Sequence, residues 1–388
     1  IPTTTAAVYG PRFDHDPVSL ACKGLLIEES RTNVALYSGA IVSNVGWFIA
    51  ETTLSTSGTG PDGNTSYQVT ETTINASHTV ANSGSTTGTS ATSVSSGVVY
   101  TGSMFLKKVA GSVDWVQLTL GSVGFGTTQY ANFNIGNGTV GNSAGLASGT
   151  SPRIENYGNG WYRCSISVAA STTTSTSFGV VIGGLNNTNG ITRLPSYLGS
   201  TANKVLAAMG QFETGSFPTS YIPTVASSVI RSADVCSISG SNFSGFYNPL
   251  EGSLFAIAST LSPNLSIRRI FSMTDGTSAN RAGLLFNSVG QPTTFVVSSG
   301  GSLSALIASS VASITSPVKI AGAYKLDDFA ISANGSVVTT DTLGLVGTGI
   351  NRLSIGNQND TEFVNGHIAS MRYFKKRLAN AKLQTITV

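Results

Sequence analysis

The sequence predicts an all-β protein with two antiparallel β-sandwich domains of the jelly-roll type in tandem, preceded by a short N-terminal arm. Three observations lead to this prediction. Short segments that alternate apolar and polar residues recur along the chain, Gly, Ser, Asn and Thr separate them, and no long stretch has helical periodicity. The 388 residues are enough for two or three domains with cores of their own. Only 10% of the residues are charged, against about 25% in ordinary soluble domains.

This composition also limits the partners. Low charge with abundant Ser and Thr favours exposed sheet faces and tightly packed subunits over a monomer with a charged surface. The net charge of +3 forms no basic stripe, so no nucleic-acid partner is expected. No run of 18 apolar residues is present, so no membrane span is expected. The three cysteines are far apart and lack metal-ligand spacing, which argues against a disulfide scaffold.

The first elements are an arm and a sandwich. Residues 1–33 are irregular apart from the apolar run 24–27, and are predicted to form an N-terminal arm or lead-in strand that meets other subunits. Residues 34–215 are predicted to form the first sandwich, in which Pro and Gly mark a turn at 61–64. Its strand candidates are 66–70, 98–106, 113–120, 130–135, 161–168 and 178–182.

A proline-containing segment follows the first sandwich. Pro218 and Pro223 fix φ and remove two backbone donors, so neither a helix nor an inner strand runs through this stretch. Phe217 and Tyr221 nevertheless indicate that the segment is packed. Residues 216–244 are therefore predicted to be a stiff hinge between two β-rich modules.

Residues 245–388 are predicted to form the second sandwich. Asn334-Gly335 is the strongest hairpin signal in the chain, and 378–383 fits one short helical turn. The strand candidates are 253–258, 269–273, 282–286, 294–297, 318–324, 328–332, 336–339, 352–356 and 367–374.

Six blocks, in order, carry a resemblance over roughly residues 11–234: Pro11-Arg12-Phe13-Asp14, Gly24-Leu25-Leu26-Ile27-Glu28-Glu29, Arg31-Thr32-Asn33, Pro61-Asp62-Gly63, Asn159-Gly160-Trp161-Tyr162-Arg163 and Phe217-Pro218-Thr219-Ser220-Tyr221-Ile222-Pro223-Thr224. The set resembles a family of tailed-bacteriophage fibre, spike and head-decoration proteins, in which such blocks bracket a carbohydrate-binding-module-like sandwich. Residues 245–388 resemble a concanavalin A/laminin-G-like domain through 320–324, 334–335, 353–356 and 366–369. The chain departs from the family pattern at 34–38, where the family usually has Leu-Leu with an acidic-aromatic continuation.

The resemblance implies a component of the virion, attached to the capsid or the tail and in contact with the host surface, often as a homotrimer. Other virion proteins and host-surface polysaccharide would then be its partners. The family blocks are mostly structural, so they transfer no catalytic residue.

Catalytic patterns are weak in this sequence, and the protein is predicted not to be an enzyme. Glycan hydrolysis needs two carboxylates about 5–9 Å apart across the bond. The adjacent pairs Glu28-Glu29 and Asp327-Asp328 would face opposite sides of a strand. The match to a nucleophile elbow at 141–145 has no helix after it.

Sugar binding needs an exposed aromatic ring together with amide and carboxylate partners. Trp115 and Trp161 lie in alternating strands and are predicted to be core residues. The predicted glycan-binding residues lie near breaks or in loops: Trp47, Tyr247, Asn248, Asn357, Asn359 and Asp360.

No cofactor is expected, with calcium as the one candidate. Its oxygen ligands would come from two predicted loops, from Asp275, Asn280, Asn357 and Asp360. The alternative is that these side chains cap their own turns.

These observations favour a non-catalytic bacteriophage virion protein, of the head or of a tail fibre, that adheres to host-surface glycans. Three alternatives remain open: an architectural capsid cement protein without a ligand, a polysaccharide depolymerase with an inter-subunit site, and a cellular adhesin or extracellular lectin.

Overall fold

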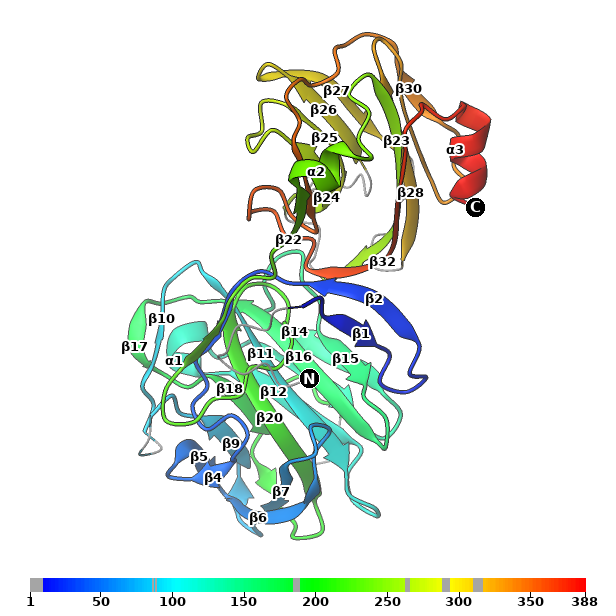
Figure 1. Ribbon diagram of the computed structural model, residues 1–388. Coiled ribbons are helices and arrows are strands. Elements are labelled where there is room, and N and C mark those ends of the chain that lie inside the picture. The colour runs from blue at the N-terminus through cyan, green and yellow to red at the C-terminus, as the bar shows by residue number, and fades with distance from the viewer. Residues whose placement is uncertain are drawn as a thin grey trace. The chain divides into compact units, whose positions relative to one another are not determined.

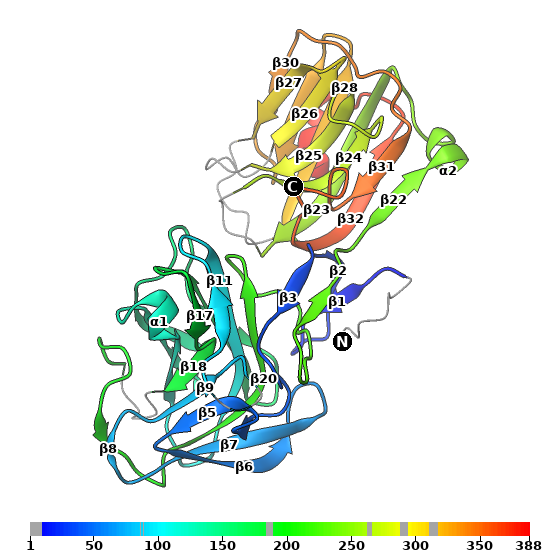
Figure 2. The same cartoon turned by 90° about the vertical axis from the view of Figure 1, so that its left-hand side faces the viewer.

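The computed structural model describes residues 10–85, 87, 89–183, 189–261, 266–287, 294–309 and 317–388. Figures 1 and 2 show two compact units. Each unit has an apolar core of its own. Among the described residues, unit 1 contains Pro17–Ser19 and Ser30–Ser232, and unit 2 contains 10–16, Leu20–Glu29 and Ala233–Val388. Both units consist of stacked, almost entirely antiparallel sheets, which confirms the predicted fold class.

Unit 1 has two large sheets and three short strand pairs. In spatial order, the six-stranded sheet contains β15 (Arg153–Asn156), β16 (Trp161–Ala169), β11 (Val99–Lys108), β20 (Lys204–Thr214), β7 (Thr65–Glu71) and β6 (Thr52–Thr59). The seven-stranded sheet contains β14 (Thr139–Ala144), β13 (Tyr130–Asn134), β12 (Trp115–Leu120), β18 (Val180–Gly183), β9 (Thr79–Asn82), β5 (Gly46–Ala50) and β4 (Val42–Ser43). The short pairs are β10 (Thr92–Val94) with β17 (Thr174–Ser177), β8 (Asn75–Ala76) with β19 (Tyr197–Leu198), and β3 (Arg31–Asn33) with β21 (Val229–Arg231).

The core of unit 1 lies between these sheets. Alternate residues of each strand point inward, as the period of two requires. Tyr100 of β11 stacks on Phe212 of β20 with ring centroids 5.4 Å apart, and Phe125 of the short helix α1 (Ser122–Phe125) meets both rings edge-on. Cys164 of β16 is fully buried in the same core.

Unit 2 is a second sandwich. Its seven-stranded sheet contains β1 (Phe13–His15), β2 (Cys22–Ile27), β32 (Gly366–Phe374), β23 (Glu251–Thr260), β28 (Val318–Lys325), β29 (Phe329–Ala333) and β30 (Thr339–Asp341). Its six-stranded sheet contains β22 (Cys236–Ser239), β31 (Arg352–Ile355), β24 (Arg268–Thr274), β25 (Arg281–Phe286), β26 (Thr294–Ser299) and β27 (Ser302–Ala308).

Two short helices accompany unit 2. α2 (Gly240–Ser244) follows β22, as Figure 2 shows, and buries Phe243. α3 (Asn380–Ile386) includes part of the predicted helical turn and packs Leu383 against Phe255 and Ala321, on the outer face of the seven-stranded sheet. Among the described residues, no helix is long and apolar enough to cross a membrane.

Of the two forms predicted for residues 1–33, the described part has the lead-in strand and is not a free arm. β2 pairs with β32 in unit 2, with Leu25 opposite Ile368. Leu26 and Ile27 are buried, because the apolar run 24–27 needs a partner sheet and finds it in unit 2. β3 pairs with β21 instead and belongs to unit 1.

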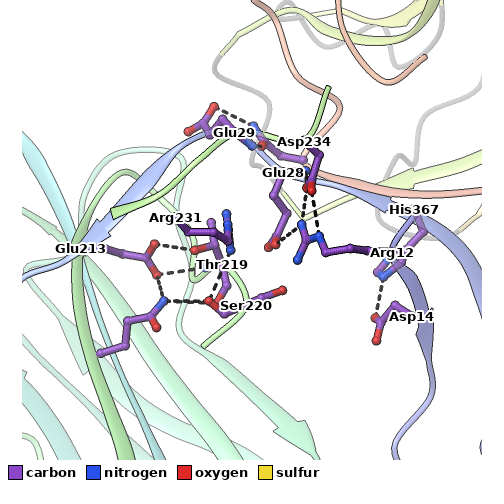
Figure 3. Close-up of polar contacts among 12 residues, drawn as sticks. Arg12, Asp14, Glu28, Glu29, Glu213, Thr219, Ser220, Arg231, Asp234 and His367 are labelled. Carbon is purple, nitrogen blue, oxygen red and sulfur yellow. Dashed lines mark hydrogen bonds and ion pairs between the residues drawn. The ribbon is translucent and has the colours of Figure 1, made fainter. Parts of the chain in front are cut away.

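The predicted hinge at 216–244 also differs from the structure. The prolines do prevent strand formation, and Phe217 and Tyr221 are packed as predicted, but they are buried with Ile222 inside unit 1 and do not form a link between two modules. The backbone N–H of Ile222 donates to Gln211 Oε1 at 2.8 Å, and its carbonyl accepts from Asn33 Nδ2 at 2.8 Å. Figure 3 shows how the buried Glu213 accepts two bonds from Thr219. Residues 217–224 are therefore a packed part of unit 1, and the chain passes to unit 2 after Ser232.

Candidate functional site

β12 places one tryptophan on the polar face of a sheet. Along this strand the side chains alternate between two faces. Val116, Leu118 and Leu120 join the core of unit 1, whereas Trp115, Gln117 and Thr119 point to the other face. Trp115 is half-buried and lies outside the apolar core. The prediction that Trp115 is a core residue is therefore wrong, whereas Trp161, which is 3% exposed, is buried as predicted.

Four amide side chains, of which Gln117 is the first, are connected by hydrogen bonds across the same face. Gln117 Nε2 donates to Asn132 Oδ1 of β13 at 2.9 Å, and Asn132 Nδ2 donates to Asn189 Oδ1 at 3.3 Å. Asn142 of β14 completes the set, since its backbone N–H donates to Asn189 Oδ1 at 2.6 Å and its Nδ2 donates to the Asn189 carbonyl at 2.8 Å. We call Trp115 and these four amides the Trp115 cluster.

Gly141 makes room for this arrangement. A Cβ at this position would lie 2.5 Å from Trp115 Cζ3 and 2.2 Å from Asn189 Oδ1, closer than real Cβ contacts allow. The indole ring therefore lies against the backbone of β14, beside the Asn189 side chain. A larger residue at 141 would displace both groups.

The segment that follows Asn189 is held on this face by the same side chains. Gln117 Nε2 donates to the Thr192 carbonyl at 3.0 Å, and Gln117 Oε1 accepts from the Leu194 N–H at 2.6 Å. Arg193 donates to Thr119 Oγ1 and to the Leu120 carbonyl, both at 2.7 Å. These bonds explain why the polar residues Gln117 and Thr119 are buried although they point away from the core.

The Trp115 cluster is electrically neutral. Its own contacts join amides, backbone groups and an indole ring. Asp114, the nearest acid in sequence, is paired with Lys108 at 2.5 Å. An aromatic ring beside neutral amide donors and acceptors is the chemistry that packs against a sugar ring and bonds its hydroxyls.

The expectation for Trp47 is wrong. Its side chain is fully buried in the core of unit 1, and its indole N–H donates to the Tyr37 carbonyl at 3.0 Å. The residue follows Gly46, but that turn directs the ring inward, where Gly210 of β20 leaves space for it. A ring without an exposed face cannot stack on a sugar.

Tyr247 and Asn248 are engaged in contacts within unit 2. The Tyr247 ring stacks on Phe243 at 4.8 Å, and burial raises the pKa of Tyr247 to about 12. Asn248 Nδ2 donates to the Lys375 carbonyl at 2.7 Å, while its Oδ1 accepts from the Leu250 N–H at 3.0 Å. Both residues therefore stabilise the segment after α2, and this geometry does not favour a glycan-binding role.

The two loops proposed for calcium do lie side by side in unit 2. The Oγ1 atom of Thr274, which precedes Asp275, lies 3.5 Å from Asn359 Oδ1. Asn357 is buried, and its Oδ1 accepts from the Asp360 N–H at 3.3 Å. The structure thus brings the predicted residues of both loops into one region at the end of β24 and β31.

The side-chain oxygens of Asp275 and Asn280 already accept hydrogen bonds, whereas a calcium shell takes six to eight oxygens. Asp275 Oδ1 accepts from the backbone and hydroxyl of Thr277, and Oδ2 accepts from Asn280 Nδ2 at 2.9 Å. Burial slightly raises the pKa of Asp275, but these hydrogen bonds lower it overall. Asn280 Oδ1 accepts from two backbone N–H groups. Within the described residues, no three His, Cys, Asp or Glu side chains are grouped as metal ligands.

Two carboxylates do meet in unit 2, around Arg12 (Figure 3). The guanidinium donates to Asp234 with two nitrogens and to Glu28 Oε2 at 3.0 Å. Burial lowers the pKa of Arg12, but Asp234 and Glu28 raise it overall. Both carboxylates are bound to the same guanidinium, so this arrangement does not place two available carboxylates on either side of a substrate bond.

Comparisons with known proteins identify no family. No family pattern and no curated protein sequence matches the chain. Among solved structures, the sialidase carbohydrate-binding module CBM40 of Ruminococcus gnavus with α2,3-sialyllactose is 16% identical, with a TM-score of 0.31, and covers 36% of this chain and 84% of its own. Mouse laminin α1 domains LG4-5 are 12% identical, with a TM-score of 0.25, and cover 73% and 86%. The sandwich assignment rests on the sheets described above, since such distant likenesses carry no argument.

Proposed function

We propose that this protein is a non-catalytic adhesion protein that binds neutral glycans through the Trp115 cluster of unit 1. The observation that carries the proposal is the half-buried Trp115 beside four connected amides on one sheet face. The hydrogen bonds among the amides hold them in place before a ligand arrives, which lowers the entropy lost on binding.

The non-catalytic part of the proposal rests on the carboxylates. None takes part in the hydrogen bonds of the Trp115 cluster described above, whereas hydrolysis needs an acid and a second carboxylate at the bond. Glu28 and Asp234, which do come together, share Arg12. Release of reducing sugar from a host polysaccharide, abolished by mutating one acid, would contradict this part.

The setting on a bacteriophage virion, as a homotrimer on the head or the tail, is proposed on the ordered sequence blocks of residues 11–234. Several weak sites on one particle would act at high effective concentration. Light scattering that finds a monomer at micromolar concentration would count against the trimer.

The test of the binding site is a glycan array followed by calorimetry. Trp115→Ala is expected to weaken binding by about tenfold or more, because it removes the stacking surface. Asn142→Ala is expected to cost about fivefold, the value of one hydrogen bond. Matched controls are Phe13→Ala, which removes an exposed ring in unit 2, and Asn64→Ala, which removes an amide in an exposed turn of unit 1.

The outcomes separate the alternatives. Both controls should bind as the unchanged protein does. A purified chain that binds no glycan on the array favours an architectural cement protein. Binding that survives Trp115→Ala would show that glycans are bound elsewhere on the protein.

A further inference from the structure

Unit 2 contains an apolar pocket of about 180 Å³ between its two sheets. Its floor is formed by buried side chains from both sheets: Leu254, Phe271, Met273 and Leu353. Its mouth is lined by half-buried residues of β22, the segment after α2, and β32: Ile238, Phe246, Met371 and Tyr373. The half-buried rim means that a ligand reaches the floor without unfolding of the sandwich.

The hydroxyl group of Tyr373, at the mouth of the pocket, is already hydrogen-bonded. The Tyr373 hydroxyl lies 2.8 Å from the Tyr324 hydroxyl and accepts from the Asn248 N–H at 2.9 Å. Burial, and secondarily the Tyr324–Tyr373 hydrogen bond, raise the pKa of Tyr324, so this hydroxyl stays protonated. The pocket therefore offers no free polar partner from this pair.

Among the described residues that line the pocket, only Arg372 is charged, and its charge lies outside the pocket. Arg372 follows Met371 in β32, so its side chain points to the opposite face of the sheet. Its guanidinium carbon lies 5.8 Å from the centroid of the Phe255 ring, and Phe255 packs with Leu383 of α3 on that outer face. A charged ligand in the pocket would lose its hydration without gaining a partner.

We propose that this pocket binds a small uncharged apolar group, an aromatic ring or an alkyl chain of about six to eight carbons. An apolar cavity of about 150 Å³ holds no water and takes up benzene, so the pocket here has room for one such group. Met273 and Met371 have unbranched side chains, which adjust to the shape of the occupant. The proposal is independent of the Trp115 cluster, which lies in unit 1.

The methionines supply the test. The chain has four, of which Met273 and Met371 line the pocket while Met104 and Met209 lie in unit 1. In the ¹³C-methyl-methionine NMR spectrum, benzene is expected to shift the signals of Met273 and Met371 in a saturable way and to leave the other two unchanged. Benzoate, which has the same ring with a charge, is expected to shift none.

Variants make the test specific. Ile238→Trp fills the mouth and should weaken benzene binding by about tenfold or more, as overpacking predicts. Met371→Phe fills it from β32 and serves if the first variant does not fold. Leu303→Trp adds the same ring at an exposed site in unit 2 and should bind as before.

Several results would overturn the proposal. These are the absence of a saturable shift at Met273 and Met371, equal shifts of all four methionines, or equal effects of benzoate and benzene. Benzene binding that is unchanged in both mouth variants would also overturn it.

Discussion

Replacing Arg12 with Ala removes the cation that joins Glu28 and Asp234 in unit 2. Glu28 is 1% exposed, so without Arg12 its negative charge loses its guanidinium partner in a dry environment. Breaking a buried ion pair by removing one partner costs about 3–5 kcal/mol. Asp234 is 20% exposed and can be solvated instead. We therefore expect the lower end, about 3 kcal/mol of lost unfolding free energy in unit 2.

The two units have separate spectroscopic reporters. All three tryptophans lie in Ser30–Ser232, so tryptophan fluorescence follows unit 1, while the methyl signals of Met273 and Met371 follow unit 2. With a urea m-value of about 2 kcal/mol/M, a loss of about 3 kcal/mol lowers the unit 2 midpoint by about 1.5 M. The fluorescence midpoint should not move.

Two further variants identify the cause. Glu28→Gln in the Arg12→Ala background removes the charge left behind and should recover part of the loss. Arg352→Ala removes an exposed arginine of unit 2 and should change the unfolding free energy by no more than about 0.5 kcal/mol. A shift below about 0.3 M in Arg12→Ala, or equal shifts of both units, would refute the reasoning.

Three further predictions concern single residues. Burial raises the pKa of Asp14, but the His367 hydrogen bond and the charge of Lys23 lower it to about 2. Ionised Asp14 therefore stabilises the folded protein above about pH 3.8, and this contribution disappears as the pH falls towards 2. Because Asp14 is 37% exposed, Asp14→Asn should cost only about 1 kcal/mol at pH 6 and nothing near pH 2, as measured by urea midpoints. Gly24→Ala should destabilise unit 2 by about 2 kcal/mol or more, because φ is 104° and the new Cβ would lie 2.4 Å from the Ile368 carbonyl oxygen. Gly240 also has a positive φ but has open space around it, so Gly240→Ala should cost less in the same denaturation assay. Exposed Cys22 should react first with a thiol reagent in the folded protein, and Cys164, whose pKa is raised by burial, only after unfolding; early labelling of Cys164 would contradict the buried position.

Much of the fold follows from local pattern, because the alternation of apolar and polar residues that marks a strand can be recognised within about five to ten residues. The two sandwiches were predictable on that basis. The partner of β2 was not, since Leu25 pairs with Ile368 at the other end of the chain and nothing near Leu25 specifies that choice. Likewise, the prolines of 217–224 exclude strand structure and its aromatic residues indicate packing, but nothing near this segment specifies its bond to Asn33, which lies 189 residues from Ile222.

The tryptophans show which local signal is reliable. Nearness to Gly46 predicted exposure for Trp47, yet the space for its ring is provided by Gly210, where a Cβ would lie 2.6 Å from the indole. This fit between the Trp47 ring and Gly210 joins two strands that are distant in sequence, so the residues near Trp47 do not indicate it. Trp115, in contrast, shares its strand phase with Gln117 and Thr119, so the sequence already places it on the polar face. The phase of an aromatic residue relative to its polar neighbours is therefore better evidence for a position outside the core than a nearby glycine is. Strand alternation determines which face a side chain occupies, whereas only tertiary packing determines whether a ring beside a glycine is exposed.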